Sequence, residues 1–122
     1  LGIVYKKEKK ELLEWSNIFI LPTFYKMEGQ PISILEALAT KNVIIATNHA
    51  GIKDVITSNV HGYLIKPKSI ESIVEPLIFL NENRDKIKEI AELNFEYFKN
   101  NFTVQKFKNE IIKTINAITR IK

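Results

Sequence analysis

Apolar and polar positions follow two different periods along the first half of the chain. Short, nearly unbroken apolar runs are separated by segments whose apolar residues recur with the period of a helix. The runs occupy residues 17–21, 43–47 and 62–66, and the helical segments occupy residues 7–15, 31–40 and 51–57. Runs of this length are typical of parallel strands that are buried on both faces. This order predicts an α/β fold in which helices cover both faces of a parallel sheet.

The second half of the chain has only helical periodicity. Amphipathic segments begin near Ser69, Asn83 and Thr103, and Ser69 and Thr103 are placed to cap the helices that follow them. We therefore divide the chain into strand and helix units at residues 1–66 and a helical tail at residues 67–122.

The beginning of the chain resembles the middle of a longer protein. Residues 1–4 have the pattern of the end of an apolar strand, whose neighbours we expect earlier in the sequence. The only methionine is Met27. We therefore expect a domain that is incomplete at its N-terminus.

Composition narrows the classes of function. Cysteine is absent, which removes disulfides, thiolate chemistry and cysteine metal sites. No apolar run approaches the roughly 20 residues of a membrane span, so we expect a cytoplasmic protein. The 18 Lys and Arg residues exceed the 14 Asp and Glu residues by four. We expect this surplus to lie on solvated helix faces, and an anionic membrane or acceptor surface and a nucleic acid are the alternatives.

Three residues with potential chemistry fit ordinary structural roles. His49 and His61 lie in turn-like segments, and they are too far from other ligand residues in the sequence to indicate a metal site. We expect both to be surface histidines, although His49 follows a strand end and is a candidate for lining a cleft. Trp15 is expected in the core.

Glu36 is the only carboxylate in the apolar segment 31–40. Apolar residues take up most of its circumference, while Ser33, Glu36 and Thr40 share a sector of about 60°. Burying an unpaired carboxylate costs on the order of several kcal/mol, so Glu36 must face water, a partner or a ligand. The pattern predicts a cleft beside this helix.

The start of the same helix suits an anion. The helix opens at Pro31 directly after a strand end, where open α/β sheets bind ligands, and its first free amides belong to Ile32 and Ser33. A phosphate or diphosphate fits there, and Gly29 allows a close approach of the backbone. Glu36, one turn further on, would accept hydrogen bonds from the hydroxyls of a neutral polyol such as ribose. The Ser33 hydroxyl either contacts phosphate or bonds within its own helix.

The sequence of residues 17–56, "NIFILPTFYKMEGQPISILEALATKNVIIATNHAGIKDVI", is followed at residues 59–67 by "NVHGYLIKP". Together they resemble the C-terminal, donor-binding domain of glycosyltransferase family 4, whose pattern is roughly "aDvfvlPS…EGfp…lEAmacGlPvia…gGipEiv…nGllv". These are retaining enzymes of the GT-B fold, so the resemblance implies a Rossmann-like domain. The segment "NFTVQKFKNEII" at residues 101–112 is similar to the closing segment of the family, so the resemblance extends over essentially the whole chain.

The resemblance assigns roles to the two glutamates. It implies that Glu28 contacts the transferred sugar, as the catalytic residue, and that Glu36 hydrogen-bonds the ribose of the donor. The donor-binding residues that it implies are Glu28, Gly29, Gln30, Ile32, Ser33 and Glu36. His49, Gly51 and Asp54 are candidate cleft residues, and Asp54 stands where the family usually has a glutamate.

The implied function is that of a glycosyltransferase in polysaccharide biosynthesis. The donor would be a nucleoside diphosphate sugar, such as a UDP-sugar, with no resident cofactor or metal and no nucleic-acid partner. A missing N-terminal domain would bind the glycan or lipid-linked acceptor, so this part alone is expected to bind the donor without catalysing transfer. Contact with the inner face of the membrane is a further expectation. The alternatives are a noncatalytic nucleotide- or partner-binding module and an accessory domain that binds anions through its lysines.

Overall fold

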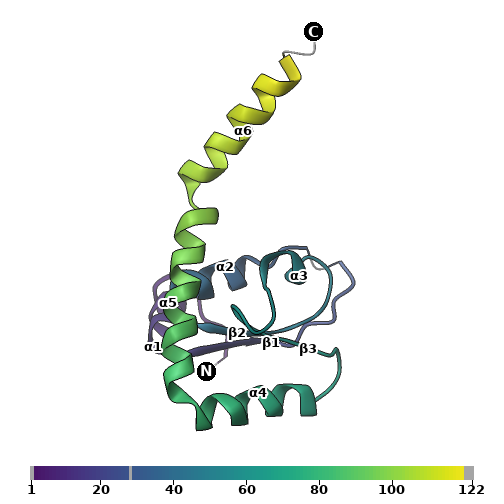
Figure 1. Cartoon of the computed structure of the whole chain (residues 1–122), viewed down its shortest axis with the longest axis vertical. Helices are drawn as coiled ribbons and strands as arrows, with labels where there is room; N and C mark the ends of the chain where they lie inside the picture. Colours follow the sequence, from purple (N-terminus) through teal and green to yellow (C-terminus); the bar gives the residue numbers. More distant parts are fainter. Residues whose placement is uncertain (1, 28, 120–122) are drawn as a thin grey trace.

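The structure is a computed structural model that describes residues 2–27 and 29–119, and its centre is a parallel sheet (Figure 1). The strands are β1 (Ile18–Leu21), β2 (Val43–Thr47) and β3 (Gly62–Ile65), which lie in the order β1-β2-β3. All five residues of β2 are buried, because β2 has a neighbour on each side and helices on each face. The parallel α/β fold confirms the predicted fold class.

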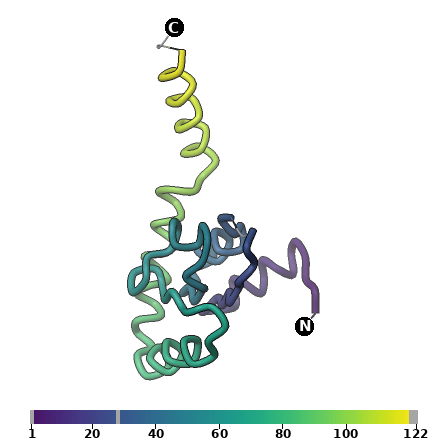
Figure 2. The backbone as a smooth tube through the Cα atoms, turned by 90° about the vertical axis from the view of Figure 1, so that its right-hand side faces the viewer, coloured from purple at the N-terminus to yellow at the C-terminus, as the bar shows by residue number. Residues whose placement is uncertain are grey.

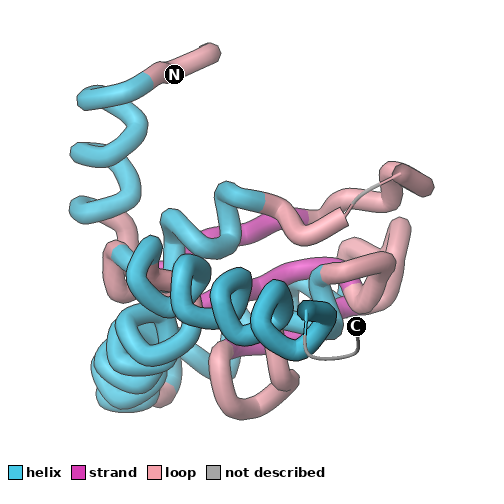
Figure 3. Tube along the Cα trace, turned by 90° about the horizontal axis from the view of Figure 1, so that it is seen from above, coloured by secondary structure: helices cyan, strands magenta, loops and turns pink. Residues whose placement is uncertain are grey.

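Helices surround the sheet on both faces. They are α1 (Lys6–Trp15), α2 (Ile32–Ala39), α3 (Ile52–Val55), α4 (Glu71–Glu82), α5 (Arg84–Asn101) and α6 (Val104–Thr119). In Figure 1, α2 and α3 cover one face of the sheet, and α4 covers the other. Seen from above, the strands run side by side and α1 stands off to one side, near the N-terminus (Figure 3). The last helix, α6, extends away from the body of the molecule (Figure 2).

The alternation of side chains along β2 divides the core into two layers. Ile44 and Ala46 pack with α2 and α3 on one face, whereas Val43 and Ile45 pack with α4 and α5 on the other. The long helix α5 contributes to both layers, since Ile90 belongs to the second cluster and the partly buried aromatic residues of its later turns pack on the first.

A buried polar network links α1, β2 and α5. The Asn94 side-chain amide donates hydrogen bonds of 2.8 Å to the main-chain carbonyls of both Asn42 and His61. The Asn42 side chain in turn accepts a hydrogen bond of 2.7 Å from the Ser16 hydroxyl and donates one of 2.8 Å to the Leu13 carbonyl. Asn42 and Asn94 are fully buried, so these bonds replace the water that the donor groups of both amides lose on folding, whereas Oδ1 of Asn94 has no hydrogen-bond partner among the described residues.

Several element ends follow their sequence signals. The helix α2 begins directly after Pro31 and ends before Thr40, as the pattern predicts. The Ser69 hydroxyl accepts a hydrogen bond of 3.3 Å from the Ser72 amide at the start of α4, and the Thr103 hydroxyl accepts one of 3.2 Å from the Lys106 amide at the start of α6. Both predicted capping bonds are therefore confirmed.

Four expectations about strands and burial are wrong. Trp15 is 82% exposed, because none of the described elements covers that side of α1. His61 is only 6% exposed, because it lies beneath α5, where it stacks on Tyr97. Ile20 in β1 is 39% exposed, because β1 is an edge strand with a single neighbour. Residues 2–4, expected in a strand, are irregular and pair with none of the described strands.

Candidate functional site

The start of α2 lies at the edge of the sheet where β1 and β2 end. Parallel strands bring their carboxyl ends to the same edge, and the loop that follows β1 leads there into Pro31. The Ile34 amide donates to the Pro31 carbonyl at 3.1 Å, while the helical geometry leaves the amides of Ile32 and Ser33 without an intrahelical acceptor. Among the described residues, the Ser33 hydroxyl makes no hydrogen bond, so its own helix does not occupy it. These groups form a cluster of free donors at the positive end of the α2 dipole.

The loop after β2 holds the loop after β1 in place. Nε2 of His49 lies 2.8 Å from the main-chain carbonyl oxygen of Tyr25, within hydrogen-bond distance. Gly51 packs against the backbone of Gly29, and a Cβ built on Gly51 would lie 2.7 Å from the Gly29 carbonyl oxygen. A Cβ on Gly29 would instead meet nothing within 4 Å, so Gly29 faces open space. Gly51 is therefore required for the close approach of the two loops, and Gly29 leaves room beside the start of α2.

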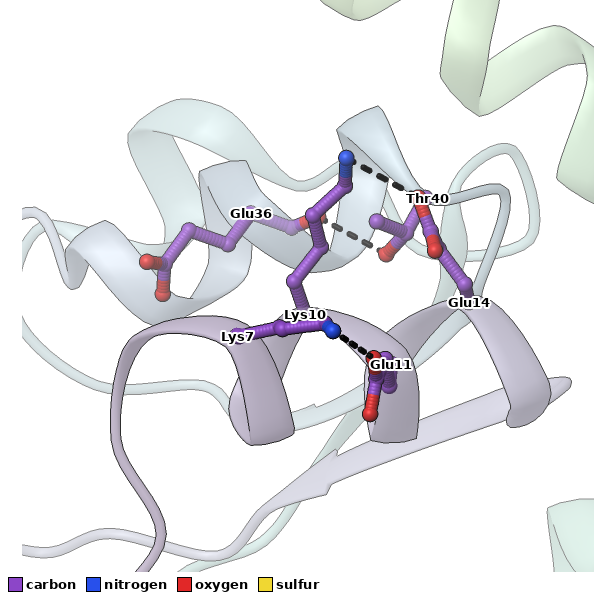
Figure 4. Close-up of polar contacts among 6 residues, drawn as sticks. All are labelled: Lys7, Lys10, Glu11, Glu14, Glu36 and Thr40. Atoms are coloured by element: carbon purple, nitrogen blue, oxygen red, sulfur yellow. Dashed lines mark hydrogen bonds and ion pairs between the residues drawn. The ribbon is translucent and has the colours of Figure 1, made fainter.

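Glu36 lies one turn into α2 and faces α1. The Lys9 ammonium of α1 lies 2.5 Å from Oε2 of Glu36, and both side chains are about 40% exposed. Oε2 itself is inaccessible to water and accepts no hydrogen bond of good geometry, so its contact with Lys9 is an ion pair rather than a directed hydrogen bond. The Glu36 side chain extends away from Thr40, back toward the amino end of α2 (Figure 4). The prediction that the Glu36 side chain points away from the core, toward water or a partner, is therefore confirmed.

A groove of about 660 Å³ lies between α1 and α2. Its walls combine apolar and charged side chains: Val4, Tyr5, Lys6, Lys9, Lys10, Leu13, Glu36, Ala39 and Thr40. The volume is in the range of small-molecule sites, and apolar walls with a few polar groups are typical of them. Glu36 therefore lines a groove beside α2, where the sequence predicts a cleft.

The other candidate residues that the structure describes lie outside this groove. Glu28, the predicted catalytic residue, lies outside the described residues. Asp54 is exposed on the short helix α3 and forms no ion pair among the described residues. Of the candidate residues that the structure describes, Glu36 is the one that lines the groove. The residues absent from the groove lining are Gly29, Gln30, Ile32, Ser33, His49, Gly51 and Asp54.

Sequence reasoning missed Lys9 and the groove wall that α1 supplies. Lys7 and Lys10 pair with Glu11 and Glu14 four residues later on the same helix (Figure 4). Lys9 has no such partner, since Leu13 stands four residues after it. This difference sets Lys9 apart from Lys7 and Lys10, but Lys6 shares it because Lys10 stands four residues after Lys6. The partner of Lys9 on α2 depends on tertiary packing.

The fold and the site together define a Rossmann-like α/β domain in which α2 begins with free amides and carries a carboxylate one turn further on. Residues 1–96 match the family model for glycosyl transferases group 1, which covers most of the chain. The chain belongs to this family.

One similar relative is an Escherichia coli enzyme, the UDP-Gal:alpha-D-GlcNAc-diphosphoundecaprenol alpha-1,3-galactosyltransferase. It is 26% identical over 117 residues, which cover 96% of this chain and 26% of the enzyme. The chain spans between 21% and 30% of the length of the first curated relatives that it matches.

Solved structures of glycosyltransferases share the fold. Anabaena Alr3699/HepE in complex with UDP superposes with a TM-score of 0.81 at 18% identity, over 88% of this chain and 29% of that protein. The C-terminal domain of the glycosyl transferase group 1 family protein LpcC from Francisella tularensis has a TM-score of 0.74 at 23% identity, over 85% of this chain and 53% of that one. The Rossmann-like domain inferred from the sequence is thereby confirmed.

Proposed function

We propose that this chain is the donor-binding part of a retaining glycosyltransferase. It binds a nucleoside diphosphate sugar, and the whole protein transfers the sugar to a glycan or glycolipid acceptor. The observation that carries this proposal is the position of Glu36, one turn after the free amides of Ile32 and Ser33 and on the wall of an open groove. At a rise of about 1.5 Å per residue, a nucleotide laid along α2 reaches from the helix start to the groove.

Each part of the donor has a matching group in this arrangement. The diphosphate lies at the start of α2, where the amides and the helix dipole favour negative charge. The ribose hydroxyls donate to the Glu36 carboxylate, and the base occupies the groove between Tyr5 and Leu13. Glu28, in the loop before α2, contacts the transferred sugar. His49 and Gly51 support that loop from behind.

The chemistry that this arrangement supports is stabilisation of the leaving group. Transfer develops negative charge on the departing nucleoside diphosphate, and fixed donors at a helix start stabilise that charge without reorganising. The same contacts hold the sugar in register with its acceptor. We assign no resident cofactor or metal to this step.

The acceptor and location of the whole protein are part of the proposal. The name of the Escherichia coli relative specifies a UDP-sugar donor and a diphosphoundecaprenol-linked acceptor. This name supports the proposal that the whole protein uses a UDP-sugar and a lipid-linked acceptor in polysaccharide biosynthesis. Because such an acceptor lies in a membrane, we also propose that the protein is cytoplasmic and contacts the membrane peripherally. Among residues 2–27 and 29–119, no helix is long and apolar enough to cross a membrane.

Calorimetric titration of the chain with UDP and UDP-glucose tests the proposal. We expect saturable binding, and we expect Glu36→Ala to weaken it at least tenfold, because hydrogen bonds to charged groups contribute about 1.5–3 kcal/mol. Glu92→Ala is the matched control, since Glu92 is an exposed glutamate of α5 paired with Lys41 in the turn after α2, and this variant should bind as the unchanged chain does.

Two outcomes would contradict the proposal. A chain shown to be folded by circular dichroism that binds neither ligand would favour the noncatalytic or partner-binding alternative. Binding that falls steeply with salt but is indifferent to Glu36 would indicate an accessory anion-binding domain instead.

A further inference from the structure

Lys9 differs from the neighbouring lysines of α1 in its partner. Lys7 and Lys10 pair within α1, at 3.7 Å and 3.5 Å from Glu11 and Glu14. Lys9 instead reaches across the groove to α2 and lies 2.5 Å from Oε2 of Glu36. In the described part of the chain, this is the ion pair that joins α1 to α2.

The two oxygens of Glu36 have different surroundings. Oε2 is inaccessible to water and lies against Lys9, whereas the side chain as a whole is 39% exposed, so its accessible area lies elsewhere. Among the described residues, Oε1 takes part in no hydrogen bond or ion pair. The carboxylate is thus held through one oxygen, and the other remains able to accept a hydrogen bond from a ligand in the groove.

We propose that Lys9 is a positioning residue that fixes the Glu36 carboxylate for the ribose of the bound nucleotide. This inference rests on the proposed function. By holding Oε2, Lys9 limits the rotamers of the glutamate and directs Oε1 to a ribose hydroxyl, so less side-chain freedom is lost when the nucleotide binds. Lys9 acts on the ligand only through Glu36.

Lys9 also balances charge beside the diphosphate. Glu36 lies a single turn from the helix start at which the diphosphate is placed, and its side chain extends toward that end of α2 (Figure 4). An unpaired carboxylate there would repel the phosphates, since charges a few Å apart near a protein surface interact strongly. Pairing with Lys9 allows a carboxylate that selects ribose to stand close to an anionic group.

The test compares the affinities of the chain for UDP and for its 2′-deoxy and 3′-deoxy analogues. The unchanged chain should prefer UDP about tenfold over the weaker of the two analogues, which is the effect of one hydrogen bond to a carboxylate. Lys9→Met should reduce this preference to about twofold or less and weaken UDP itself. Lys9→Arg, which can still pair with Glu36, should retain most of the preference.

The preference for ribose separates positioning from a merely structural ion pair. If Lys9 only joined α1 to α2, Lys9→Met would lower the stability and affect all three ligands equally, leaving the ratio of affinities unchanged. Lys7→Met is the matched control, because it removes an equal charge from the same helix without touching Glu36. Adding Lys9→Met to a Glu36→Gln chain should then have no further effect on the ratio.

The outcomes distinguish this inference from the proposed function. If the unchanged chain binds no nucleotide, both are overturned. If it binds UDP through Glu36 but Lys9→Met keeps the full preference for ribose, only the role of Lys9 is overturned. Loss of the preference in Lys9→Met, with its retention in Lys9→Arg and Lys7→Met, supports the inference.

Discussion

The helices α2 and α6 are both rich in apolar residues, yet they have opposite environments. In α2, the side chains of Ile34, Ala37 and Leu38 are completely buried against the sheet and α5. In α6, which extends away from the body of the molecule (Figure 1), no residue is buried and the apolar stripe is exposed. The exposed fractions in that stripe are 66% for Phe107, 42% for Ile111, 56% for Ile112, 53% for Ile115 and 58% for Ile118.

The comparison shows what an apolar pattern does and does not determine. In α2 the apolar residues surround most of the helix, so the pattern itself requires burial and leaves one polar sector for Glu36. In α6 the pattern is one-sided, which is sufficient for a helix but says nothing of what covers its apolar face. The stability of the described chain should therefore depend on the sheet and α2, and hardly on α6.

The largest expected effect is at Gly62, which supports the core that α2 covers. Gly62 has a φ of +147°, and a Cβ there would overlap the backbone of Ile44 on the neighbouring strand. We expect Gly62→Ala to destabilise the chain by about 4 kcal/mol or more, measured by urea unfolding. Gly29→Ala is the control, because its Cβ meets nothing within 4 Å, and its unfolding free energy should change by less than about 0.5 kcal/mol.

The next largest effect is expected on the buried face of α2. Leu38 is 0% exposed, and Leu38→Ala removes three carbon atoms from the cluster that joins α2 to the sheet. The cost should be about 2–5 kcal/mol, since a lost burial and a residual cavity add together. A change of less than about 1 kcal/mol in urea unfolding would contradict the description of α2 as a core helix.

The sequence predicted the parts of the molecule in which local pattern and packing agree. The ends of β2 follow from a run buried on all sides, the start of α2 follows from Pro31, and the outward direction of Glu36 follows from the angular position of one polar sector. Each of these depends on residues within the same element, which is why the sequence was sufficient.

The sequence could not supply the features that depend on a second element. Trp15 and His61 were misjudged because their burial is decided by whether another helix covers them. The second wall of the groove and the partner of Glu36 were missed because α1 supplies them from more than 20 residues away in the chain. These are tertiary contacts, and no local period encodes them.

A smaller effect, on pH dependence, is expected from His61. Burial lowers the pKa of His61 below its ordinary value of 6.5, and its Nδ1 accepts a hydrogen bond of 3.0 Å from the Thr57 amide, which a protonated ring cannot do. The unfolded chain therefore binds more protons than the folded chain as the pH falls below about 6.5. Stability contributed by the neutral ring is present above that pH and is lost as the pH falls toward the lowered pKa.

Urea unfolding between pH 7.5 and pH 5 measures this loss. His61→Asn should flatten the profile, whereas His49→Asn, which changes a less buried histidine, should leave the decline in place. An equally steep decline in His61→Asn would show that other groups cause it.

The smallest expected effect lies in α6, and it tests whether the apolar stripe of this helix is as exposed as the comparison with α2 requires. Ile115 is 53% exposed, so Ile115→Ala removes little buried surface and places a better helix former in the helix. The unfolding free energy should change by less than about 0.5 kcal/mol, in contrast to Leu38→Ala.

Measured at two protein concentrations tenfold apart, this small effect should also be the same at both. A loss approaching that of Leu38→Ala would mean that the stripe of α6 is covered in solution. If the loss of stability grew with protein concentration, the surface that covers α6 would belong to a second copy of the chain. Both helices would then be buried, α2 within one chain and α6 between two chains.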